Sequence, residues 1–215
     1  MRKFAWIVIG LVGMVLLGYA QTDPTAKAIL DKVSDTYQHF GTVESDFLFV
    51  MDNPNQEKRS TEGKLMLEMK SGKYKVILGS QEFISDGTTQ WTVMKEQNEV
   101  QVNDVDNNDN SLNPTTIFTF YKKGYKSIFT GVTKVGQQSL NAIELVPIDT
   151  KQNIFKIKMR VDKASNLIYD VTVLDKAGGK YTYTIQKTVI NKEMPEGIFT
   201  FTKSKYPGIE IVDLR

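Results

Sequence analysis

The stretch "ISDGTTQW", residues 84–91, carries an Asp-Gly pair, Asp86-Gly87, between two runs in which apolar and polar residues alternate. An Asp-Gly pair in that setting is a strong short-range signal for a β-hairpin, because glycine and aspartate tolerate the backbone angles that a tight turn needs. An aspartate on a loop is also a candidate catalytic acid. We favour the turn interpretation, which predicts that Asp86 is structural and that the surrounding chain is an antiparallel sheet.

Outward from this hairpin, apolar residues recur at every second position from Val43 onward. In "NIFKIKMRV", residues 153–161, they alternate with lysine and arginine, and "GKLMLEMK", residues 63–70, repeats the pattern. Asn-Pro, Ser-Gly and Gly-Gly pairs between the runs are typical of turns. About ten short strands, each with one apolar and one polar face, indicate an antiparallel sheet with one side in water.

The apolar faces of these strands predict a binding surface. A single curved sheet has a concave apolar face, and where covering elements do not reach it, an apolar cavity remains for a lipid or another hydrophobic ligand. The alternative is that helices seal the sheet and leave an ordinary core. Alternation assigns to the expected cavity wall the side chains of Phe47, Leu65, Leu67, Met69, Trp91, Val93, Phe155, Ile157 and Met159.

Two segments have other patterns. In residues 23–41, Asp23 is the expected N-cap, Pro24 the first helical residue and Gly41 the end of an amphipathic helix. Residues 104–124 begin with a polar stretch and continue with apolar and aromatic residues, which predict a short helical lid over the cavity. A strand is the alternative, since this segment is rich in β-formers. The expected lid side chains are Ile117, Phe118 and Phe120.

Residues 1–20 differ from the rest of the chain. Arg2 and Lys3 precede an apolar run of about fourteen residues, and small residues stand before Gln21, which is the layout of a secretory signal peptide cleaved near Ala20. Without residues 1–20 the 27 basic residues fall to 25, equal to the 25 acidic ones. We therefore expect a single exported domain over residues 21–215, acting as a monomer, and the balanced charge gives no reason to expect a nucleic-acid partner.

The sequence offers little for catalysis. It has no cysteine, so thiolate metal sites, disulfides and cysteine nucleophiles are excluded. Its one histidine, His39, has no G-x-S-x-G serine to pair with, and phosphate-binding glycine motifs are missing. We expect no enzymatic activity, no cofactor and no metal site. An exported hydrolase with a scattered active site is the alternative.

Several segments, in their order along the chain, resemble the segments of one known protein family. Residues 28–47, "AILDKVSDTYQHFGTVESDF", look like the opening of that family, and residues 62–76, "EGKLMLEMKSGKYKV", look like its G-x-L hairpin. The Asp-Gly of "ISDGTTQW", with Trp91 four residues after Gly87, is similar to its most recognisable motif. Residues 199–215, "FTFTKSKYPGIEIVDLR", look like its closing pair of strands.

The family that these segments resemble is the outer-membrane lipoprotein carrier family, LolA. This resemblance implies a mainly β fold with α: an incomplete, half-open antiparallel β-barrel with an N-terminal helix and a short helical lid over an apolar cavity. It implies a periplasmic carrier that binds the acyl chains of lipoproteins and shuttles them towards the outer membrane. Its partners would be acylated lipoproteins, an inner-membrane releasing complex and an outer-membrane receptor. A lipid-binding sensor or regulatory module is the alternative. Where the family has an Arg-Pro latch, this chain has Lys70, which lacks the forked guanidinium group.

Overall fold

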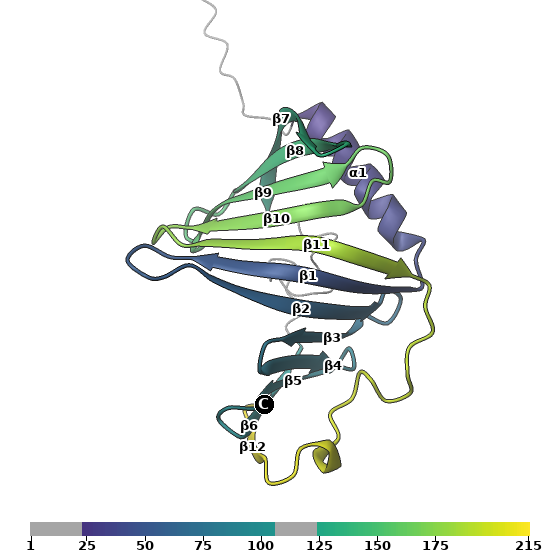
Figure 1. Ribbon diagram of the computed structural model, residues 1–215, viewed down its shortest axis with the longest axis vertical. Coiled ribbons are helices and arrows are strands. Elements are labelled where there is room, and N and C mark those ends of the chain that lie inside the picture. The colour runs from purple at the N-terminus through teal and green to yellow at the C-terminus, as the bar shows by residue number, and fades with distance from the viewer. Residues whose placement is uncertain (1–22, 106–123) are drawn as a thin grey trace, which may run out of the picture.

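The chain folds around one twelve-stranded sheet (Figure 1). The computed structural model describes residues 23–105 and 124–215, so the expected signal peptide and the expected lid side chains Ile117, Phe118 and Phe120 lie outside the described residues. In spatial order the strands are β12-β6-β5-β4-β3-β2-β1-β11-β10-β9-β8-β7. Their bounds are β1 Thr42–Asp52, β2 Arg59–Glu68, β3 Lys73–Leu78, β4 Gln81–Ser85, β5 Thr89–Met94, β6 Glu99–Asp104, β7 Tyr125–Val135, β8 Gln138–Pro147, β9 Ile154–Asp162, β10 Ile168–Asp175, β11 Lys180–Ile190 and β12 Glu210–Asp213.

The helix α1 (Pro24–Gln38) begins as the sequence predicts. Asp23 caps it by accepting a hydrogen bond from the backbone N–H of Thr25 at 2.7 Å, and Pro24 fills the first turn, where no donor is needed. The expectation that Gly41 ends the helix is wrong. The helix ends at His39, whose backbone N–H donates to the Tyr37 carbonyl, and Gly41 instead donates its N–H to Asn191 Oδ1 at 2.7 Å.

Asp23 also ties this helix to the edge strand β7. Its backbone N–H donates to the Ser127 carbonyl at 3.0 Å, and its Oδ2 accepts the N–H of Phe129 at 3.0 Å. One carboxylate therefore caps the helix and satisfies part of a free sheet edge. The buried stripe of α1 is Ala26, Leu30, Val33, Ser34 and Tyr37.

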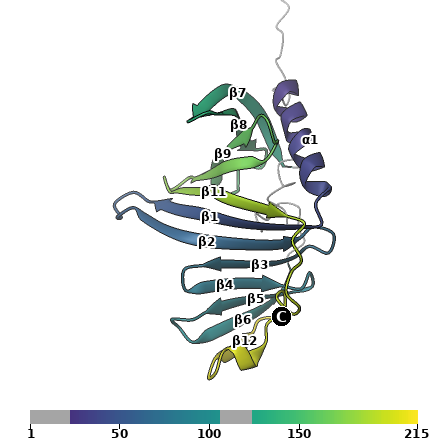
Figure 2. The ribbon, with the colours of Figure 1, turned by 45° about the vertical axis from the view of Figure 1, so that its right-hand side comes forward.

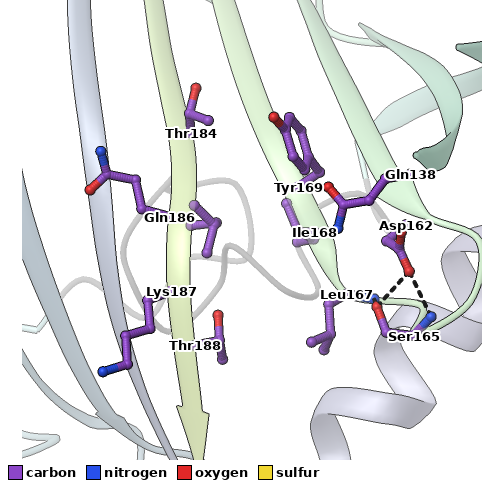
Figure 3. Close-up of a pocket in the computed structure, with 11 residues that line it drawn as sticks. Gln138, Asp162, Ser165, Leu167, Ile168, Tyr169, Thr184, Gln186, Lys187 and Thr188 are labelled. Atoms are coloured by element: carbon purple, nitrogen blue, oxygen red, sulfur yellow. Dashed lines mark hydrogen bonds between the residues drawn. The ribbon is translucent and has the colours of Figure 1, made fainter. Parts of the chain in front are cut away.

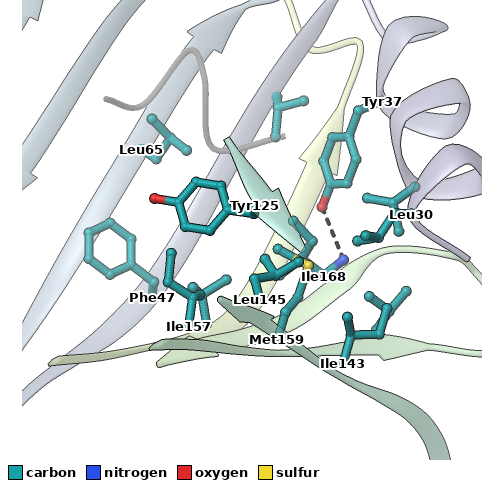
Figure 4. Packing of buried hydrophobic residues seen from close by; sticks show 14 of the residues in the cluster. Leu30, Tyr37, Phe47, Leu65, Tyr125, Ile143, Leu145, Ile157, Met159 and Ile168 are labelled. Carbon is teal, nitrogen blue, oxygen red and sulfur yellow. Dashed lines mark hydrogen bonds between the residues drawn. The ribbon is translucent and has the colours of Figure 1, made fainter. Parts of the chain in front are cut away.

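The sheet curls so that one of its faces, here called the inner face, encloses the main apolar cluster. Tyr125 of β7 and Leu65 of β2 belong to the same cluster although five strands separate them in the sheet (Figure 4). The α1 stripe packs into the same cluster, and the helix lies beside the β7 end (Figure 2). The two edge strands, β12 and β7, do not pair with each other. The sheet is therefore open, and the predicted half-open antiparallel architecture with an N-terminal helix is confirmed.

The C-terminal segment covers the outer face of the sheet at its other end. Ile209 packs with Ile84, Val93 and Val100 in a second apolar cluster, to which Phe201 and Tyr206 of the same segment contribute partly buried rings. The chain then forms β12, which pairs parallel with β6. Residues 199–215, expected to form a closing pair of strands, therefore contain one short strand, β12, preceded by a segment that packs over the second cluster.

The Asp86-Gly87 pair forms a turn, as predicted. Asp86 Oδ1 accepts the backbone N–H groups of Thr88 at 2.9 Å and Thr89 at 2.8 Å, so this oxygen stabilises the turn. Gly87 has a φ of 93°, and a Cβ there would lie 2.9 Å from the Ser71 carbonyl oxygen. A glycine is therefore required both by the backbone angle and by the neighbouring hairpin.

Candidate functional site

The inner face brings together most of the residues that alternation assigned to the cavity wall. Phe47 and Leu65 are buried in the main cluster, and Met69 packs against it from a partly exposed position. Ile157 and Met159, on the distant strand β9, belong to the same cluster on the inner face (Figure 4). Leu67, also among the predicted wall residues, is buried there too. Six of the nine predicted wall residues therefore lie in or against one apolar cluster on the inner face.

Trp91 and Val93 do not belong to the main cluster on the inner face. Leu67 pairs with Tyr74, Tyr74 with Ser85 and Ser85 with Gln90, and residues that pair across a sheet point to the same face. Trp91 follows Gln90 and therefore points to the outer face, as does Val93 two residues on. Both side chains belong to the second cluster, under the C-terminal segment.

Phe155 also lies outside the inner face. The β9–β10 register shifts between Leu174 and Asp175, which pair with Lys156 and Ile154 respectively. Phe155 is the extra residue of this irregularity and is 58% exposed, while Ile154 packs against the main cluster instead. A bulge of this kind re-aims one side chain and cannot be read from alternation.

The ring of Phe47 lies directly across Gly63, its partner on β2. A Cβ at Gly63 would stand 2.3 Å from Cζ and 2.5 Å from Cε2 of this ring. Gly63 therefore makes room for the aromatic side chain within the sheet. The glycine of the G-x-L hairpin thus has a steric role in the inner face.

Several inner-face residues were not in the predicted wall. Tyr74 of β3, Tyr125 of β7 and Leu145 of β8 are buried in the main cluster. The ring of Tyr183 on β11 packs against Phe49 with centroids 4.8 Å apart. All lie in alternating runs, so tracing the face from strand to strand would have found them. Burial raises the pKa of Tyr74 to about 12, so this phenol stays neutral in the wall.

Charged side chains occupy the outer face as paired groups. The Glu44 carboxylate accepts hydrogen bonds from Lys192 Nζ at 2.8 Å and from Lys64 Nζ at 3.3 Å. The hydrogen bond from Lys192 is the main reason that the pKa of Glu44 lies below its ordinary value. Arg160 forms a two-pronged pair with Asp170. The acids of these pairs, Glu44 and Asp170, are largely covered, and each is matched by a cation on the outer face.

Glu82 joins the outer face to the C-terminal segment. This buried carboxylate accepts Lys75 and Lys95, each at 2.6 Å, and the hydroxyl of Tyr206 at 2.8 Å. Burial raises the pKa of Glu82, but these three donors outweigh burial and bring the pKa to about 2. Tyr206 is thereby fixed over the second cluster.

Across residues 23–105 and 124–215, no three His, Asp or Glu side chains gather where they would hold a metal ion. Within these ranges no helix has the length and hydropathy to cross a bilayer. His39 is an exposed helix-end residue, its Nδ1 2.5 Å from the Asp35 carbonyl oxygen. Lys70 is exposed in the β2–β3 turn, and the described part of the chain gives it no ion pair.

A hollow opens where β10 and β11 separate, a place here called the fork (Figure 3). β11 pairs with β1 along its whole length, but with β10 only from Lys180 to Thr184. The hollow has a volume of about 570 Å³. Its lining is mostly polar, with an apolar part formed by Leu167, Ile168 and Ile185.

Comparison with known proteins agrees with this geometry. The profile of the family described as "Outer membrane lipoprotein carrier protein LolA" matches residues 39–202. No curated protein matches the chain. An uncharacterized conserved protein from Thermus thermophilus has a similar structure, with a TM-score of 0.61 and 10% identity over 88% of this chain and 99% of that one.

Two further solved structures are similar. The Pseudomonas aeruginosa MucA/MucB complex contains a chain that matches with a TM-score of 0.50 and 12% identity, over 83% of this chain and 62% of that one. A putative outer membrane lipoprotein-sorting protein domain from Vibrio parahaemolyticus matches with a TM-score of 0.48 and 13% identity, over 82% and 96%. At these identities the likeness concerns the fold.

Proposed function

Because the chain belongs to the LolA family of outer membrane lipoprotein carrier proteins, we propose that it is a periplasmic carrier that shields lipoprotein acyl chains on its inner face and carries them towards the outer membrane. The observation that carries the proposal is the large apolar cluster that an open, curved sheet encloses on its inner face. Its wall includes Phe47, Leu65 and Met159. The family is one of carriers, and the proposal involves no covalent chemistry.

The driving force is the transfer of alkyl groups out of water. Each buried methylene contributes about 0.8 kcal/mol, so about fifteen methylenes contribute roughly 12 kcal/mol when fully buried. A carrier must also release its cargo, which favours incomplete burial against an adaptable wall. The partly buried Met69, Val76 and Phe83, at the margin of the cluster, provide such a wall.

The partners follow from this role. The cargo is an acylated lipoprotein, received from an inner-membrane releasing complex and delivered to an outer-membrane acceptor. A carrier gives up its cargo to a second membrane, whereas a sensor module on the same fold would bind lipid and keep it. Transfer therefore separates the two functions.

The test is native mass spectrometry of the protein purified from its own envelope, followed by transfer of the bound cargo to liposomes. We expect an acylated polypeptide to co-purify and to move to the vesicles. Val76 and Ile77 on β3 provide matched variants, because both are partly buried but point to opposite faces. Val76→Asn should reduce the cargo, and Ile77→Asn should not. Recovery of the protein without acylated cargo, or equal loss in both variants, would contradict the proposal.

A further inference from the structure

The fork between β10 and β11 leaves part of a strand without a partner. On one side, Ile185 and residues 187–190 of β11 pair with β1, and Gln186 is the extra residue of a register shift. Among the described residues no strand pairs with residues 185–190 on the other side. A strand rises about 3.4 Å per residue, so this free edge is roughly 20 Å long. An unpaired edge of that length presents backbone N–H and C=O groups that an extended peptide can meet by adding a strand.

The fork is held open by α1. The backbone N–H of Ile168, at the start of β10, donates to the hydroxyl of Tyr37 at 3.3 Å. The preceding turn is fixed by Asp162, whose Oδ1 accepts the N–H groups of Ala164 at 3.0 Å and Ser165 at 2.8 Å. The start of β10 is therefore bound to the helix and to its own turn, and not to β11.

The lining of the fork changes character across the sheet. Ile168 and Ile185 belong to or pack against the main apolar cluster, so the fork adjoins the proposed acyl-chain surface. Thr184 and Lys187 point to the outer face, because they pair with Asp170 and Asp46, and Asp46 is itself paired with the outward Lys64. The hollow thus meets the apolar Ile168 and Ile185 towards the inner face, beside one inward hydroxyl, that of Thr188, and polar groups such as Lys187 towards the outer face.

This arrangement matches the chemistry of one part of an acylated polypeptide. Its acyl chains need apolar surface, whereas the peptide next to them needs hydrogen-bond partners. Taking the proposed carrier function as its basis, we infer that the fork binds the extended peptide segment next to the acyl chains of the cargo. The peptide backbone pairs with the free edge of β11, while the acyl chains pass Ile168 and Ile185 to the inner face. The volume of about 570 Å³ suits a short peptide and lies within the usual range for ligand pockets.

The test uses the absence of cysteine in this chain. Lys187→Cys places a single thiol in the fork, and Lys180→Cys places one on the same strand where it is paired with both neighbours. Both lysines are exposed, so both variants can be modified with a bulky thiosulfonate reagent and unblocked with a reductant. The probes are a synthetic triacylated lipopeptide and palmitate, which has an acyl chain but no peptide.

We expect modification of Lys187→Cys to weaken lipopeptide binding roughly tenfold or more, the effect of losing one or two hydrogen bonds, while palmitate affinity is unchanged. Reductant should restore the affinity, and modified Lys180→Cys should behave as wild type. Hydrogen exchange should also show new protection of β11 amides in residues 186–189 with lipopeptide and none with palmitate.

The other outcomes are distinct. If blocking the fork leaves lipopeptide affinity unchanged, the peptide assignment is overturned and the carrier function stands. If blocking weakens both probes equally, the fork is a path for acyl chains and not a peptide site. If neither probe binds the wild-type protein, the proposed function fails, and the inference fails with it.

Discussion

Replacing Gly63 by alanine should disrupt the inner face through a single methyl group. The new Cβ would lie 2.3 Å from Phe47 Cζ and 2.5 Å from Cε2, far inside van der Waals contact, so the ring must leave its place. Phe47 is only 6% exposed. Expelling a buried phenylalanine costs about 1.5–3 kcal/mol of transfer free energy, and retaining it with strain costs about 1–3 kcal/mol. Either route predicts a loss of about 2 kcal/mol in the free energy of unfolding.

The assay is thermal unfolding followed by palmitate titration. A loss of about 2 kcal/mol lowers the Tm of a domain of this size by roughly 4–8 °C. Palmitate affinity should fall as well, since Phe47 lies in the proposed wall. Gly41→Ala is the matched control, because its Cβ would meet only Asn191 Oδ1, at an ordinary 3.5 Å.

A double-mutant cycle tests the cause. In a Phe47→Leu background the ring is absent, so the added cost of Gly63→Ala should shrink to a few tenths of a kcal/mol. A Gly63→Ala protein with unchanged Tm, or one whose penalty persists without the ring, would refute the steric argument.

Three further outcomes follow from the structure. Asp86→Asn should keep both folding and cargo binding, because its amide oxygen can accept the same two N–H groups. Gly87→Val should lower the Tm, because φ is positive there and a Cβ would approach the Ser71 carbonyl oxygen; circular dichroism melts of the two variants compare them. The pKa of Glu82 in the folded protein is about 2, against an ordinary 4.5, so this carboxylate stabilises the fold fully above pH 4.5 and the stabilisation is lost as the pH falls towards 2. The drop in stability at low pH should be smaller in Glu82→Gln, and urea unfolding midpoints at several pH values would show it. In the chain without residues 1–20, Trp91 is the one tryptophan and points to the outer face, so palmitate should leave its fluorescence unchanged, and a strong shift on binding would place the ligand elsewhere.

The sequence predicts the local features that depend on neighbouring residues. Asp23 followed by Pro24 marks the helix start because capping and proline geometry are local. Asp86-Gly87 marks a turn for the same reason. The end of the helix at His39 was not predicted, because Gly41 has the residue type of a helix stop but is used to meet Asn191, 150 residues away.

Which face a strand presents depends on every turn before it. Leu65 pairs with Val76, Val76 with Phe83 and Phe83 with Thr92, so inner positions are odd in β2, even in β3, odd in β4 and even in β5. Trp91 and Val93 therefore face outward. The sequence could have shown this, because a hairpin with Asp86 and Gly87 as its two central residues also puts Trp91 and Val93 on the face opposite to Phe83. The bulge that exposes Phe155 has no such signal, because only the pairing of two strands shows it.

The arrangement of the two clusters explains how an open sheet can offer an apolar face to a ligand and still be stable. The strands β4–β6 have a core of their own on the outer face, since Ile84, Val93 and Val100 pack there under the C-terminal segment. Glu82 fixes that segment through Tyr206. Apolar side chains on the inner face of the same strands, such as Phe83 of β4, are only partly buried. Because the packing that stabilises these strands lies on the opposite side, acyl chains can bind to and leave the inner face without dismantling the core that holds the strands together.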